Sequence, residues 1–154
     1  MHKKAQISTE YMFIIGLAMA ILIPGSVIFY QYTQTSNEQS IAAQINQIGK
    51  TIINNAETIY VVGKNSWTTL QISFPETIVD AYILDSEDEL VIEYATQRGV
   101  TQAVFFADIN ITGNYLTSDP DRQDISPNFH SGLAHIKIES RGGYISIGEI
   151  IAEK

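Results

Sequence analysis

The sequence predicts an α+β protein, in which one long N-terminal α-helix packs on a small antiparallel β-sheet or sandwich. Three observations support this. Residues 11–30 form an apolar run. Residues 41–59 carry apolar side chains three and four positions apart, the period of an amphipathic helix. From Trp67 onward apolar and polar residues alternate, the period of a half-buried strand. We therefore expect a helix over 6–63 and a β-rich head over 67–154.

The apolar run is long enough to cross a membrane as a helix. No charged residue occurs between Glu10 and Glu38. About twenty helical residues span roughly 30 Å, the thickness of the hydrocarbon core, and a helix satisfies its own backbone there. Lys3 and Lys4 precede the run and favour a cytoplasmic N-terminus, so we expect the head to lie outside the cytoplasm. A removable secretory signal would have a shorter apolar region than this one.

Two features of the apolar helix need a separate interpretation. Glu10 lies at its start, and a carboxylate deep in a bilayer costs about 3 kcal/mol. The simplest interpretation is that Glu10 lies in the headgroups and marks the helix start. Pro24-Gly25 lies inside the run. Because proline removes one helix hydrogen bond and clashes with the preceding turn, we expect a kink or a locally unwound turn there.

The residues before the run form a more specific pattern. Lys3-Lys4-Ala5 is followed by Gln6-Ile7-Ser8-Thr9-Glu10-Tyr11 and then by the apolar helix. This order resembles the class III signal peptide of archaeal type IV pilin-like proteins, which has a short basic leader, cleavage before Gln, and Gln-x-Ser-x-Glu before a hydrophobic stretch. Two residues depart from that pattern, since Ala5 stands where Gly is usual and Ile14 stands where Leu is common.

The resemblance implies a life cycle for the chain. A prepilin peptidase would cut between Ala5 and Gln6, remove the leader 1–5 and leave a free amine on Gln6. Glu10 would then offset the amine of its own or a neighbouring subunit, because a desolvated carboxylate needs a partner. In related filaments the helices form a central core, and melting near a proline such as Pro24 can accompany assembly.

The resemblance also implies partners and a location. The partners are other copies of the chain, the peptidase, and an assembly ATPase with its membrane platform. The protein would lie in the cell membrane before assembly and in an extracellular surface filament afterwards, as a pilin subunit. The alternative is a minor pilin-like or membrane-anchored surface protein whose head binds a ligand or an envelope partner. Cell adhesion and other pilus roles stay open.

The second half of the helix has one apolar face. Its members lie three or four residues apart: Ile41, Ile45, Ile48, Ile52, Ala56 and Ile59. Gly63 is a suitable C-terminal cap. A helix from Gln6 to Val62 would be about 85 Å long at 1.5 Å per residue, more than a small head needs. We therefore expect only its second half to pack on the head.

The head shows six strand-like segments separated by turn signals. They cover residues 67–74, 77–84, 89–94, 101–107, 134–139 and 144–151. The turns are charged at 85–88 and glycine-containing at 98–99 and 141–143. We expect Trp67 and the tyrosines to lie in the sheet core rather than to form a binding platform. The segment 114–132 has few apolar residues and two prolines, so we expect a long surface loop there.

That loop contains the only weak metal candidates. Asp119, Asp121 and Asp124 offer the oxygen ligands that calcium prefers, but the EF-hand spacing and glycine are absent and Arg122 lies among them. A solvated acidic loop is the preferred interpretation, and we expect no cofactor. Asn110-Ile111-Thr112 matches the N-glycosylation acceptor sequence, so Asn110 is a candidate glycoprotein site.

Composition excludes several functions. The chain has no cysteine, so neither disulfides nor thiol chemistry is available. A net charge of -8 argues against binding nucleic acid through its phosphates. His130 and His135 lack the spacing and the partners of a zinc site. Neither a nucleophile elbow nor a phosphate loop is visible, so we expect a protein that is not an enzyme.

Overall fold

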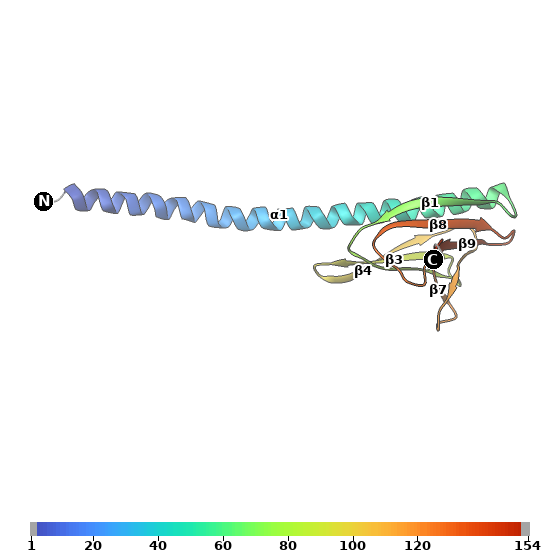
Figure 1. Cartoon of the computed structure of the whole chain (residues 1–154). Helices are drawn as coiled ribbons and strands as arrows, with labels where there is room; N and C mark the ends of the chain where they lie inside the picture. Colours follow the sequence, from blue (N-terminus) through green and yellow to red (C-terminus); the bar gives the residue numbers. More distant parts are fainter. Residues whose placement is uncertain (1–2, 152–154) are drawn as a thin grey trace. The chain divides into compact units, whose positions relative to one another are not determined.

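The computed structural model describes the backbone of residues 3–151 and the side chains of residues 9–151. The chain divides into two compact units, residues 1–40 and 41–154, which are described separately below. Helix α1 (Lys3–Val62) contributes to both units (Figure 1). The predicted α+β class is confirmed, since the rest of the described chain forms strands and turns.

The first unit is helical throughout its described residues. The helix continues through Pro24 and Gly25 without an unwound turn, and the kink that we expected as the other possibility stays a prediction. The φ angle of a proline is close to that of a helix, so the helical assignment can continue through Pro24 although one hydrogen bond is lost and the ring crowds the preceding turn. Ser26 Oγ donates to the Ile23 carbonyl at 2.8 Å, which gives a backbone acceptor of this turn a second partner.

The helix ends where the sequence places its cap. Gly63 has a φ angle of 109°, in the left-handed region that glycine adopts without strain. Its N–H donates to the Ile59 carbonyl at 3.3 Å. Ser66 Oγ lies 2.9 Å from the Ile59 carbonyl and 2.6 Å from the Gly63 carbonyl, so the end of the helix is well satisfied.

The strands form two sheets (Figure 1). The first sheet has the order β1 (Trp67–Phe74), β8 (Gly132–Ser140), β9 (Ile145–Glu149) and β5 (Ile111–Gly113). The second has the order β4 (Gly99–Phe106), β3 (Glu89–Thr96), β2 (Ile78–Leu84), β7 (Arg122–Asp124) and β6 (Tyr115–Leu116). All neighbours are antiparallel except β5 and β9, which are parallel.

All six predicted strands and their turns are confirmed, with small shifts at their ends. The β3–β4 hairpin turns at Gln97-Arg98, and Gly99 has a φ angle of 121°. The β8–β9 hairpin turns at 141–144, where Arg141 N donates to the Tyr144 carbonyl at 3.0 Å. Turn residues with special backbone geometry therefore set these hairpins.

One hydrophobic core joins the second half of α1 to both sheets. The predicted apolar face of the helix is confirmed. Its buried members in this core are Ile45, Ile48, Ile52 and Ala56, and Ile53 is buried with them. Ile41 and Ile59 lie at its margin. The closest approach is at Gly49, where an added Cβ would overlap the ring of Phe105 on β4. A glycine is therefore required where the strand meets the helix.

Two expectations about the head are wrong. The segment 114–132 is not simply a surface loop, because it contains β6 and β7 and buries Ile125 and Ser126. These strands are too short and too polar to show a period of two. Trp67 is not in the sheet core, since 62% of its surface is exposed. Lys137 Nζ lies 5.9 Å from the centre of its ring.

Candidate assembly segment and polar sites of the head

The apolar run of the first unit is exposed along its whole length. Every residue from Tyr11 to Tyr30 is exposed, and Phe13, at 75%, is the most exposed of the large apolar side chains. The most apolar stretch of the helix has a mean hydropathy of 2.5 and none of it is buried within the chain. It is long and apolar enough to cross a membrane. Exposed apolar surfaces of this extent mark sites of contact with a membrane or with other proteins.

Glu10 lies on this exposed helix, one turn before Ile14. With Thr9, Phe13 and Ile14 it borders an open and largely apolar hollow of about 440 Å³. Ala5 and Gln6 have helical backbones, but their side chains lie outside the described residues. Cleavage between these two residues and pairing of Glu10 with the amine of Gln6 stay predictions.

The three aspartates of the weak calcium prediction do not converge. Asp124 pairs with Arg122 at 3.0 Å, and Asp121 accepts from Ser86 N at 3.0 Å and Ser86 Oγ at 2.9 Å. Asp119 accepts from the N–H of Asp121 at 3.1 Å. Within residues that the structure describes, no group of three acidic or histidine side chains is placed to hold a metal ion. These carboxylates therefore order the turn that contains β7.

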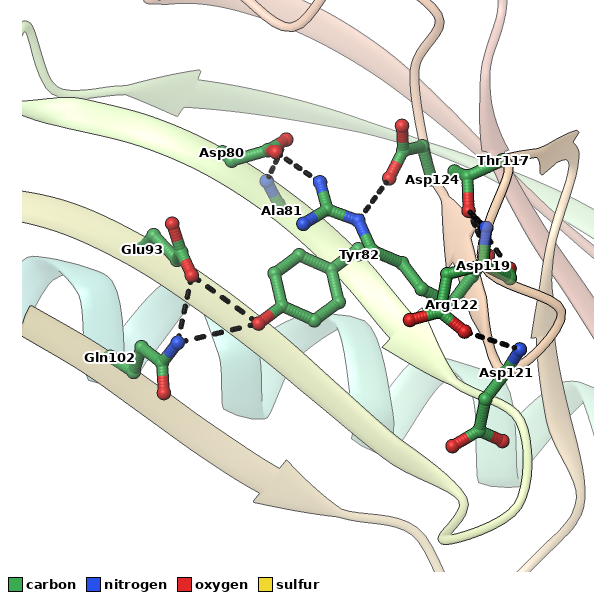
Figure 2. A network of polar contacts seen from close by, with 10 residues as sticks. All are labelled: Asp80, Ala81, Tyr82, Glu93, Gln102, Thr117, Asp119, Asp121, Arg122 and Asp124. Carbon is green, nitrogen blue, oxygen red and sulfur yellow. Dashed lines mark hydrogen bonds and ion pairs between the residues drawn. The ribbon is translucent and has the colours of Figure 1, made fainter.

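Arg122 is the centre of a polar network that sequence reasoning missed. Figure 2 shows its guanidinium between Asp80 on β2 and Asp124 on β7, with ion pairs to both. It lies 4.0 Å from the centre of the Tyr82 ring, a cation–π contact. Burial lowers the pKa of Arg122, but its hydrogen bonds to Asp124 and Asp80 outweigh burial and raise it. The arginine therefore stays charged and joins β7 to β2.

The network continues across the sheet from Tyr82. Its hydroxyl donates to Glu93 Oε1 at 3.3 Å, and Gln102 Nε2 donates to the same oxygen at 2.8 Å (Figure 2). Burial and the charge of Glu93 raise the pKa of Tyr82, so the phenol stays protonated. These residues come from three strands, and no local sequence pattern connects them. Their arrangement is typical of a structural network, without a nucleophile and base pair.

His130 and His135 lie at one open hollow of about 300 Å³, which Glu149 also borders. His130 Nε2 is 3.1 Å from Glu149 Oε1, while its Nδ1 is 3.0 Å from the Ser131 carbonyl. The hydrogen bond to Ser131, and then the charge of Glu149, raise the pKa of His130. The pair ties the end of β9 to the loop before β8.

Asn110 is exposed and lies immediately before β5. It borders an open hollow of about 480 Å³ with Asp85, Asp88 and Tyr144. Thr112 of the acceptor sequence is half-buried and donates to Gln123 Oε1 at 2.9 Å. The asparagine amide is therefore accessible in the folded head, and glycosylation of this residue stays a prediction.

No protein family model, curated protein or solved structure matches this chain. The described residues alone therefore supply the clues to function. Among the described residues the exposed apolar helix is the strongest indication of a partner, since the polar groups of the head mainly satisfy each other.

Proposed function

We propose that this chain is a pilin-like structural subunit of an archaeal type IV pilus-like surface filament. The single observation that carries the proposal is the uncharged helix of residues 11–30, exposed along its whole length and headed by Glu10. The leader pattern before it, Lys3-Lys4-Ala5 and Gln6, supports the same proposal. A peptidase removes the leader, and copies of the apolar helix then pack together as the filament core.

Lipid and a helical bundle are both suitable environments for the apolar side chains, and this explains how one segment serves in two places. In the membrane the helix satisfies its backbone internally. In a filament the same side chains bury each other outside the membrane, where their burial is worth about 25 cal/mol per Å². The second unit keeps its own core, so it folds independently of this change of surroundings.

Glu10 tests the proposal against simple membrane anchoring. We expect Glu10→Gln to leave leader removal and membrane insertion nearly normal, because the cleaved bond lies outside the changed side chain. Fibre yield should fall strongly. An amine of Gln6 that is buried without its counter-charge costs about 3–5 kcal/mol relative to the paired state, and the cost repeats at every subunit.

The measurement compares cleaved chain in membranes with chain in sheared fibres, with N-terminal sequencing to establish the start at Gln6. Glu38→Gln is the matched control, since it removes a carboxylate from the same helix beyond the apolar run. Equal fibre yields from the two variants would remove the charge-pairing role from Glu10. If the unsubstituted chain is found in membranes but not in sheared fibres, the alternative is favoured: an anchored surface protein whose head binds a partner.

A further inference from the structure

Charged residues are distributed unusually among the strands of the head. β2, β3, β7, β8 and β9 each contain charged residues, whereas β1 (WTTLQISF) and β4 (GVTQAVFF) contain none. These two strands of eight residues each form one outer edge of their sheet. Natural proteins commonly place charge, proline or a bulge on an outer strand, because its unpaired backbone would otherwise pair with another chain. Here the inner strands have the charges and the two long outer strands lack them.

The register shows which backbone groups of β1 and β4 are available. Ser140 N donates to the Ser66 carbonyl, so the backbone groups of the even-numbered residues of β1 bond to β8. The backbone N–H and C=O of the odd-numbered residues point away from the sheet, and we call these the outward residues. Ala107 N donates to the Asp88 carbonyl, so the odd-numbered residues of β4 bond to β3 and the even-numbered residues face outward. Each edge therefore presents four outward residues.

The helix leaves an open hollow beside each of these two strands. An open hollow of about 320 Å³ lies between α1 and β1 and is bordered by Gln71 and Ser73. Another, of about 330 Å³, lies between α1 and β4 and is bordered by Val104 and Phe106. One contact covers part of β1, where Gln44 Nε2 donates to the Ser73 carbonyl at 3.4 Å. The other three outward residues of β1 have no such contact among the described bonds.

The outward residues also present apolar side chains. Phe106 is 72% exposed, and Val100 and Val104 on the same face of β4 are exposed too. Trp67, which is also exposed, is the first outward residue of β1. An antiparallel alignment of the two outward sets places Trp67 opposite Phe106 and Thr69 opposite Val104. The same alignment places Gln71 opposite Gln102 and Ser73 opposite Val100. Two aromatic, two β-branched and two amide side chains therefore meet in three of the four pairs.

We infer that β4 of one copy of this chain pairs with β1 of a second copy in this antiparallel register, and so joins neighbouring heads. The inference rests on the proposed function, because a filament brings many heads together. A β4–β4 pair between two copies would close on itself and leave β1 and Trp67 uncovered. The β1–β4 pair uses both edges of every head and repeats without closing, as a filament requires.

Cysteine crosslinking tests this pairing directly, because the natural chain has no cysteine. Residues opposite each other in a hydrogen-bonded antiparallel pair have Cα atoms about 5.5 Å apart, within the range that a disulfide spans. The full-length double variant Thr69→Cys/Val104→Cys, oxidised in sheared fibres, should form a ladder of dimers, trimers and larger species. Each single variant should remain monomeric.

The matched control is Thr69→Cys/Ser118→Cys, which places the second cysteine on an exposed loop instead of β4. No ladder is expected from it. Equal ladders from the control, a dimer from Val104→Cys alone, or monomer only from the Thr69/Val104 variant would each overturn the pairing.

A second arm separates this inference from the proposed function. If fibres contain the chain but the Thr69/Val104 variant does not ladder, only the pairing fails. If fibres lack the chain, the filament proposal fails. The Thr69/Val104 variant is then oxidised in cell membranes, and its crosslinked species are analysed there. A ladder there supports pairing of the heads, and monomer there overturns it.

Discussion

The two halves of α1 are both rich in isoleucine, but their apolar side chains have opposite surroundings. Residues 11–30 are apolar on all sides and exposed, whereas residues 41–59 are apolar on one face, which is buried against two sheets. Ile21 is 67% exposed and Ile52 is fully buried. The contrast shows that helix formation is a local property, while the role of an apolar side chain depends on the surface opposite it. The first half needs partners from outside the chain, and the second half already has them.

Truncation should give the largest difference between the halves. A chain that begins at Gln39 keeps the buried face of α1, so we expect a soluble monomer that unfolds cooperatively. A chain that begins at Trp67 loses that face and exposes the core side of both sheets, so we expect it to aggregate. Size-exclusion chromatography and thermal unfolding measure both outcomes. A monomeric 67–154 chain as stable as 39–154 would show that the helix does not complete the core.

Ile52→Ala and Ile21→Ala compare the same substitution in the two halves. At Ile52 it leaves a cavity among fully buried neighbours, and we expect the free energy of unfolding of the head to fall by about 2–5 kcal/mol. At Ile21 the side chain is 67% exposed and belongs to the other unit, and we expect no change. Urea denaturation of the detergent-solubilised chain, followed by a signal from the head, measures both. Equal effects would contradict the separation of the two units.

Glycine to alanine substitutions probe the same contrast with one added methyl group. Gly49→Ala forces the Phe105 ring or the helix to move, and we expect a loss of about 1–3 kcal/mol in head stability. Gly16→Ala meets nothing within 4 Å and should favour the helix by about 1 kcal/mol in isolation. Thermal unfolding measures the first and circular dichroism in micelles the second. Unchanged stability in Gly49→Ala would mean that Phe105 does not pack there.

The smallest expected effect is the pH dependence of the head. The hydrogen bond from Lys137, followed by the charges of Lys137 and Arg141, lowers the pKa of Glu139 below its ordinary value of 4.5. Because the pKa of Glu139 is lower in the folded state, its ionised carboxylate adds to the free energy of unfolding above pH 4.5. This stabilisation is lost as the pH falls through the folded pKa. The pair is near the surface, so the loss should stay under about 1 kcal/mol. In Lys137→Met the free energy of unfolding should depend less on pH below 4.5, as measured by urea denaturation at a series of pH values. The same pH dependence in the variant and the parent would contradict the role of Lys137.

Periodicity alone predicts most of the fold. Residues 41–59 repeat every three or four positions and residues 67–74 alternate, because a helix or a strand with one buried face imposes its geometry on the sequence. The Gly63 cap and the hairpin turns are equally local. The apolar run needed no structure either, since twenty uncharged residues determine a helix that cannot remain in water.

Only the tertiary structure decided the features that depend on residues distant in the sequence. In the sequence Arg122 is a single basic residue in an acidic segment. It lies between Asp80 and Asp124 only because β7 pairs with β2. Gly49 reads as an ordinary helical residue until Phe105 is placed against it. The absence of charge in β1 and β4 has meaning only once the strand order makes both of them edges. Strand order is a set of long-range contacts, and the local backbone preferences that periodicity records contain no information about it.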